Sequence, residues 1–181
     1  MNSLRWLPLS AAATLLPASV CAATFTTADD FAKRSFPGAT AFREVLVAPT
    51  PDEAQLLAGA GGPPRLAPLR TIEARQGEAT LGRVVVDAVI GKFEQIDYAV
   101  ALGTDGRVMA VEILTYRESH GAEVRLPAWR NQFAGKGAAD PIQLGTDIQN
   151  ISGATMSCTH LTDGVHRIVA WAAKRPLAAK S

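Results

Sequence analysis

The order of apolar and polar residues divides the chain into a mixed first part and a strand-rich second part. In the first part, a helix is expected to open at residues 27–30, where a threonine can cap it and two aspartates suit its positive end. A strand is expected at residues 42–47. A second helix starts with Pro-Asp-Glu at residues 51–53 and ends in the glycines at positions 59, 61 and 62. Prolines at positions 63, 64 and 68 then predict a stiff connector.

From residue 69 onward the pattern is that of strands. Residues 81–90 are rich in valine. Two apolar runs, at residues 96–102 and 108–114, flank a Gly-Thr-Asp-Gly-Arg turn, which predicts a β-hairpin. No helical segment separates these strands, so we expect them to form an antiparallel meander.

A helix is predicted to end the domain. It follows a polar loop, a short helix around residues 127–134 and a second loop that runs to about residue 152. Residues 157–174 carry an apolar stripe with helical spacing, formed by Leu161, Val165, Ile168, Val169 and Ala172. A lysine and an arginine followed by Pro176 mark the end of this helix. Strands grouped together, with helices packed on them, define an α+β fold.

The beginning of the chain has the pattern of a secretory signal peptide. A single basic residue, Arg5, precedes an apolar run at residues 7–20, and alanines suited to cleavage follow at positions 22 and 23. The alternatives are a membrane anchor and, because of Cys21, a lipoprotein. The apolar run is shorter than the about 20 residues that cross a bilayer, and two prolines interrupt it. We therefore expect the protein to be exported to the periplasm.

Three segments follow from these patterns. Residues 1–23 are expected to be the signal peptide, residues 24–70 an N-terminal extension of helices and a strand, and residues 71–175 a single domain.

Composition excludes several classes of function. The chain has 181 residues, is 48% hydrophobic and carries a net charge of +1 without a run of basic residues, so it has no electrostatic footprint for nucleic acid. Two cysteines exclude a disulfide scaffold and a four-cysteine metal or iron–sulfur site. Signal cleavage removes Cys21 and leaves Cys158 alone. The motifs of nucleophilic hydrolases, nicotinamide dinucleotide sites and c-type haem are absent.

The segment that points to chemistry is Ser-Gly-Ala-Thr at residues 152–155, immediately before the last predicted helix. Gly153 allows a positive φ, and Ala154 adds almost no bulk. The start of a helix offers free N–H groups and a positive dipole end, where a phosphate can bind. Thr155 and Ser157 add hydroxyl groups. In the structural alternative, one of these two residues is only a helix cap.

Three segments resemble, in order and spacing, the FMN-binding domain family. They are Tyr-Arg-Glu-Ser-His-Gly at residues 116–121, Trp-Arg-Asn-Gln-Phe-Ala-Gly-Lys at 129–136 and Ile-Ser-Gly-Ala-Thr-Met-Ser at 151–157. This domain is found in the periplasmic flavin subunits of the sodium-translocating NADH:quinone reductase and of the Rnf complex, and in small exported flavoproteins. The resemblance covers about residues 81–170. It implies that residues 71–175 form one FMN-binding domain.

The resemblance implies a redox carrier with FMN as its cofactor, rather than a stand-alone enzyme. In the family, the threonine of Ser-Gly-Ala-Thr is joined to FMN by a phosphoester bond, and Thr155 is the matching residue. A separate exported flavin transferase that uses FAD installs the bond. The implied partners are therefore this transferase and a membrane-bound redox complex.

The candidate cofactor-binding residues are Ser152, Gly153, Ala154, Thr155, Ser157, Glu118, Ser119 and Trp129. In the family, the loop that corresponds to Glu118 and Ser119 approaches the flavin ring, and an ordinary polar loop is the alternative. Trp129 is expected either to cover the ring, since aromatic faces pack well on flat rings, or to pack onto the sheet. Lys136 as a phosphate partner and Cys158 as a neighbour of the cofactor are weaker candidates. The simpler interpretations are that Lys136 is exposed to solvent and that Cys158 is a small residue of the core.

One position departs from the family pattern. The family has an aspartate three residues before the serine of the motif, where this chain has Gln149. The nearest acid is Asp147, which could substitute only if the loop bulges. Gln149 favours a second hypothesis, an exported module that keeps the fold without a flavin. A third hypothesis, a flavin-dependent reductase for a small substrate, requires an open pocket.

Overall fold

Six strands form one antiparallel sheet in the order β1-β6-β5-β4-β3-β2. In the computed structural model, which describes residues 23–58 and 65–177, they are β1 (Ala23–Thr24), β2 (Ala41–Val47), β3 (Leu69–Gln76), β4 (Ala79–Ile90), β5 (Gln95–Gly103) and β6 (Val108–Tyr116). Each strand from β2 to β5 pairs with the next one along the chain, and β1 pairs with β6. The predicted α+β fold and its antiparallel meander are thereby confirmed.

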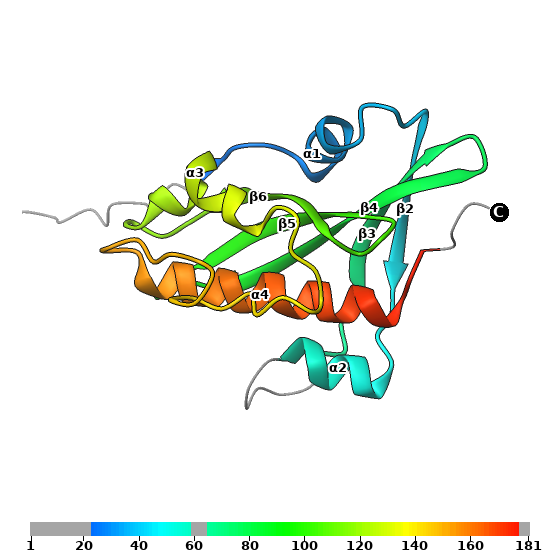
Figure 1. Ribbon diagram of the computed structural model, residues 1–181. Helices are drawn as coiled ribbons and strands as arrows, with labels where there is room; N and C mark the ends of the chain where they lie inside the picture. The colour runs from blue at the N-terminus through cyan, green and yellow to red at the C-terminus, as the bar shows by residue number, and fades with distance from the viewer. Residues whose placement is uncertain (1–22, 59–64, 178–181) are drawn as a thin grey trace, which may run out of the picture.

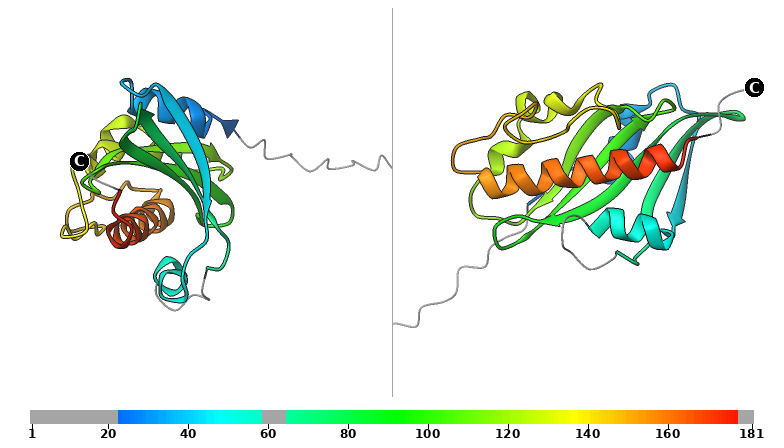
Figure 2. Two further views of the ribbon diagram at one scale, coloured as in Figure 1. Left: turned by 90° about the vertical axis from the view of Figure 1, so that its right-hand side faces the viewer. Right: turned by 60° about the horizontal axis from the view of Figure 1, so that its bottom comes forward.

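Helices cover both faces of this sheet. They are α1 (Ala28–Ser35), α2 (Pro51–Ala58), α3 (Pro127–Arg130) and α4 (Thr155–Lys174), with two 3₁₀ turns, η1 (Ala122–Arg125) and η2 (Asn131–Phe133). Figure 1 shows α4 running along the sheet, and the left view of Figure 2 shows the sheet curving around α4, with α1 on its other face. None of the helices in the described residues is both long enough and apolar enough to cross a membrane.

The alternation of residues along β5 shows how the two faces differ. Tyr98 and Val100 belong to the cluster of buried side chains under α4, whereas Ala99 and Ala101 belong to the cluster under α1. Gly164 of α4 lies so close to β5 that an added Cβ would overlap the Tyr98 hydroxyl. This close approach explains a glycine in the middle of a helix, where it otherwise lowers stability.

The first two predicted helices, α1 and α2, have side-chain caps at their starts. Thr27 caps α1 by accepting a hydrogen bond from the Asp30 N–H at 3.1 Å. Thr50 and Glu53 form a reciprocal capping box at the start of α2, with Thr50 N to Glu53 Oε2 at 2.7 Å. The predicted short helix at residues 127–134 consists of α3 followed by η2, and α4 begins at Thr155, two residues before its predicted start. The glycines and prolines expected at residues 59–64 lie outside the described residues, as does most of the predicted signal peptide.

Residues 24–70 contribute to the same sheet as the rest of the chain. β2 pairs with β3 along its whole length, from Ala41 opposite Arg75 to Val47 opposite Leu69. Helix α1 covers one face of the sheet. The predicted extension and the predicted domain therefore share one sheet and its buried core.

Candidate functional site

The start of α4 presents free backbone donors. Gly153 has a φ of 86°, and Ala154, the N-cap residue, leaves the helix without a side-chain cap. The first bond within the helix runs from Cys158 N to Ala154 O at 2.9 Å. The N–H groups of Thr155, Met156 and Ser157 precede that bond and lie at the positive end of the helix dipole. Neither Thr155 nor Ser157 acts as the cap.

The Thr155 side chain is exposed, and its hydroxyl has one hydrogen-bond partner among the described residues. Asn150 Nδ2 donates a hydrogen bond to Thr155 Oγ1 at 3.1 Å. The sequence alone does not identify Asn150 as a residue of the site. The only available signal was a polar amide in the loop that leads to the motif, because the contact itself depends on how that loop turns.

A cleft of about 370 Å³ opens beside Thr155. The turn between β4 and β5, the loop after β6 and the start of α4 form its walls. Its lining residues are Lys92, Phe93, Glu118, Ser119, His120, Gly153, Ala154, Thr155, Met156 and Ser157. Ser152 lies next to it, in an adjoining hollow of about 290 Å³ that Ser119 and Gly153 also line. The fold thus brings seven of the eight candidate residues to one place, with Trp129 as the exception.

Glu118 holds two walls of this cleft together. Its Oε1 accepts hydrogen bonds from Phe93 N at 2.6 Å and from Glu94 N at 3.0 Å. Burial alone would raise the pKa of Glu118, but these backbone N–H groups and the Lys92 ammonium lower it below its usual value. The carboxylate is therefore anionic and already bonded to the protein.

Ser157 lies at the buried base of the cleft. Tyr116 donates its hydroxyl proton to the His120 carbonyl oxygen at 2.6 Å, so Ser157 Oγ, 3.1 Å from the Tyr116 oxygen, donates to it. Burial raises the pKa of Tyr116. Gly121, with a φ of 82°, allows this packing, since an added Cβ would lie 2.9 Å from the Tyr116 hydroxyl and 3.0 Å from Ala154 Cβ. These contacts join the loop after β6 to the first turn of α4.

Three of the sequence candidates lie away from the cleft. Trp129 is 4% exposed, its ring packs edge-on against Phe133, and its Nε1 donates to the Gln149 carbonyl at 2.8 Å. The fold therefore places Trp129 in the core. Cys158 is fully buried, which raises the pKa of its thiol. Lys136 Nζ forms an ion pair with Asp147 Oδ2 at 2.7 Å.

The acidic group nearest the motif in sequence is bonded within its own loop. Asp147 accepts hydrogen bonds from Gln143 N at 2.7 Å and Ile142 N at 3.2 Å, in addition to the Lys136 pair. Burial raises the pKa of Asp147, and these bonds lower it below its usual value. Gln149 is exposed at the position of the family aspartate. Within residues 23–58 and 65–177, no group of three His, Cys, Asp or Glu side chains could hold a metal ion.

The fold thus places an uncapped helix start and an exposed threonine at a cleft, an arrangement that can bind a phosphate. In the sequence comparison, residues 91–170 match the model of the FMN-binding domain family. The resemblance in the three sequence segments is confirmed. Among solved structures, the crystal structure of Shewanella oneidensis NqrC is similar, with a TM-score of 0.51 and 16% identity over 81% of this chain and 83% of that chain. At this identity the match shows the fold alone. No curated protein matches the sequence.

Proposed function

We propose that the protein is an exported electron carrier whose FMN is joined to Thr155 by a phosphoester bond. It would pass electrons between a membrane-bound reductase and a periplasmic acceptor. The observation that carries this proposal is the exposed Thr155 hydroxyl at the uncapped start of α4, on the wall of a cleft. The match of residues 91–170 to the FMN-binding domain family supports the identity of the cofactor.

The residues around Thr155 fit the phosphate of FMN. Free N–H groups and the positive end of α4 favour an anionic phosphate group there. Gly153 leaves open space, since an added Cβ would meet no atom within 4 Å. The cleft also has an apolar side, because Phe93 and Met156 are 74% and 44% exposed beside it. A flat aromatic ring system can pack on such a surface.

Each part of this site has a separate task in the proposed function. Bound FMN supplies the redox chemistry, which transfers one or two electrons. The start of α4 binds the phosphate, and the Asn150 amide orients Oγ1 of Thr155. In the attachment reaction, the Thr155 hydroxyl loses its proton, its Oγ1 bonds to the FMN phosphorus of FAD, and AMP leaves. A partner transferase supplies the catalysis, so the chain itself needs no general base at Thr155.

The test is production of the protein together with a flavin transferase, followed by its visible spectrum and its mass after denaturation. The unmutated protein and Thr155→Ser should be yellow and heavier by the mass of one FMN less one water, because both keep a hydroxyl. Thr155→Ala should lose the covalent flavin. Thr159→Ala, which removes a hydroxyl one turn further along α4, serves as the matched control and should keep it. Flavin that survives denaturation in Thr155→Ala would contradict the proposed linkage and make Ser157 the next candidate.

Gln149 favours a second function, an exported module that keeps the fold and binds no flavin. At the position of the family aspartate this chain presents a neutral amide, and the Asp147 carboxylate is bonded within its own loop. A colourless protein of unmodified mass, recovered from cells in which the transferase modifies another substrate, would support this function and contradict the carrier.

A further inference from the structure

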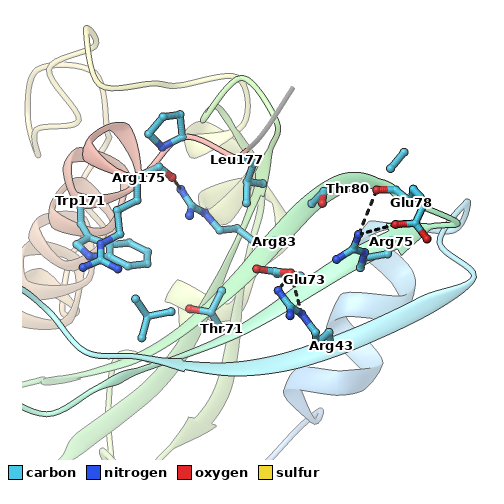
Figure 3. Close-up of a pocket in the computed structure, with 13 residues that line it drawn as sticks. Arg43, Thr71, Glu73, Arg75, Glu78, Thr80, Arg83, Trp171, Arg175 and Leu177 are labelled. Atoms are coloured by element: carbon cyan, nitrogen blue, oxygen red, sulfur yellow. Dashed lines mark hydrogen bonds and ion pairs between the residues drawn. The ribbon is translucent and has the colours of Figure 1, made fainter. Parts of the chain in front are cut away.

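A larger pocket, of about 620 Å³, lies at the other end of α4. Figure 3 shows it between the last turn of α4 and strands β2, β3 and β4. From Thr155 to Arg175 the helix spans roughly 30 Å at its usual rise per residue. This pocket, here called the arginine pocket, is therefore separate from the cleft beside Thr155.

The sheet places charged residues side by side at this end. Arg43 pairs with Glu73 across β2 and β3, and Glu73 pairs with Arg83 across β3 and β4. Residues directly opposite one another in adjacent strands share one face of the sheet. Thr71, two residues before Glu73, lies on that face as well. Trp171 of α4 packs over the same face and closes one side of the arginine pocket.

Three buried polar atoms around this pocket have no hydrogen-bond partner in the part of the chain that the structure describes. They are Thr71 Oγ1, Arg83 Nε and Trp171 Nε1, and their residues are 3%, 6% and 0% exposed. All three residues line the arginine pocket. Each of the three atoms can donate a hydrogen bond, and buried donors are nearly always paired in native proteins. A ligand with acceptor oxygens would satisfy all three donors, and it reaches them only when the side chains that cover them shift, because each atom has almost no accessible surface.

Arg83 also differs from the arginines around it in its charge partners. Arg43 pairs with Glu73 at 2.8 Å, and Arg175 pairs with Glu53 at 2.6 Å. Arg83 instead donates from Nη2 to two carbonyl oxygens at the end of α4, those of Ala172 at 3.0 Å and Arg175 at 2.7 Å. Burial lowers the pKa of Arg83, but a guanidinium stays protonated. A buried positive charge thus lacks a bonded carboxylate among the described residues.

We propose that the arginine pocket binds a small organic anion. Its carboxylate or phosphate accepts hydrogen bonds from Arg83, Thr71 and Trp171, and its apolar part packs against the pocket's Val47 and Leu177. The Arg83 guanidinium lies 5.1 Å from the centre of the Trp171 ring, so charge and aromatic surface meet at the same place. The arginine pocket shares no lining residue with the Thr155 cleft, so binding there is independent of the proposed flavin.

The test is a titration of the mature, ¹⁵N-labelled protein with sodium benzoate, with sodium phosphate and with sodium chloride at equal ionic strength. The signals to follow are the Trp171 indole N–H and the Arg83 Nε–H. The Trp129 indole N–H, bonded to Gln149 at the other end of the molecule, is the internal control. We expect a saturable shift of the first two signals with benzoate or with phosphate. The anion that saturates at lower concentration identifies the head group.

A pair of variants makes the test specific. Thr71→Val removes the unpartnered hydroxyl without changing the shape of the side chain, and should weaken binding by roughly 3- to 10-fold, the loss of one hydrogen bond. Thr162→Val removes another buried, unpartnered hydroxyl that does not line the arginine pocket, and should leave the affinity unchanged. Arg83 is left in place because its Nη2 holds the end of α4. The proposal is overturned if neither benzoate nor phosphate gives a saturable shift, or if chloride gives an equal shift. Unchanged affinity in Thr71→Val would overturn it as well.

Discussion

At the scale of single residues, the proposed attachment of FMN requires an accessible Thr155 hydroxyl. Thr155 lies in the first turn of α4, where its side chain is exposed and its Oγ1 accepts a hydrogen bond from Asn150. An amide that donates to Oγ1 leaves the hydroxyl proton free to be removed. The neighbouring residues hold the walls of the cleft, whereas Asn150 contacts Thr155 Oγ1, the proposed attachment atom.

The first prediction concerns Asn150. Asn150→Ala should lower the fraction of chains that bear FMN by roughly 3- to 10-fold when the transferase is limiting, because one orienting hydrogen bond is lost. The melting temperature should not change, since the residue is exposed. Gln143→Ala removes an exposed amide from the same loop and is the control. Equal modification of all three proteins, measured by intact mass, would show that Asn150 has no part in attachment.

The second prediction concerns Gln149. Gln149→Asp should increase the flavin-modified fraction, because a carboxylate can bind a metal ion of the transferase or accept the threonine proton, and an amide does neither well. Gln149→Asn has the same shape as the aspartate variant and no charge. If the two variants are modified to the same extent in the same time course, acid placement is irrelevant to attachment in this protein.

At the scale of elements, one ion pair joins α2 to the end of α4. Glu53 closes the capping box of α2 and accepts bonds from Arg175 at 2.6 and 2.8 Å. The Arg175 guanidinium, assisted by Thr50, lowers the pKa of Glu53 to about 2 from an ordinary 4.5. A carboxylate with a lowered pKa stabilises the fold above its unfolded pKa, and this contribution is lost as the pH falls through the folded pKa.

The third prediction follows from that linkage. The melting temperature of the protein should fall between pH 4.5 and about 2, as Glu53 becomes protonated and its bonds to Arg175 weaken. Glu53→Gln should be less stable at pH 6 and should lose less stability across the acid range. Thermal unfolding at several pH values measures both. The same acid dependence in the variant would assign the loss to other carboxylates.

Elements with strong local signals could be predicted from the sequence, and those that depend on pairing could not. The capped α1, the hairpin of β5 and β6, and the apolar stripe of α4 all follow from short-range chemistry. The sequence indicates strands from residue 69 onward but does not delimit β3, because its pattern, Leu-Arg-Thr-Ile-Glu-Ala-Arg-Gln, alternates with charges that only the pairing with β2 explains. Trp129 is similar, since its place in the core depends on the distant Gln149 carbonyl. The motif residues were recognised, but the bond from Asn150 depends on the loop conformation.

At the scale of the whole molecule, the first third of the chain completes the sheet. β2 covers the edge of β3, and α1 covers a cluster that includes Ile72, Ala74 and Val84. An uncovered β edge and an exposed apolar face both favour aggregation. The family match begins only at residue 91, yet the core extends to residues well before it.

The fourth prediction tests this dependence. A fragment of residues 65–181 should fail to fold as a monomer, because it lacks α1 and β2. Size-exclusion chromatography and thermal unfolding should show aggregates without a cooperative transition. The protein that begins at residue 24 is the control and should unfold cooperatively. A monomeric fragment with a sharp transition would show instead that the later residues form an independent domain.

The fifth prediction concerns the mature N-terminus, which is expected at Ala23 or Thr24 after signal cleavage. The structure gives the earlier cut a physical consequence, because β1 pairs Ala23 with Tyr116 and Thr24 with Thr115 at the edge of the sheet. Cleavage after position 22 keeps both pairs, whereas cleavage after position 23 removes the first. Intact-mass analysis of the exported protein distinguishes the two. Leucine at both positions 22 and 23 should block cleavage, since the site requires small residues. Retention of residues 1–22 in the unmutated protein would contradict the prediction and favour a membrane anchor.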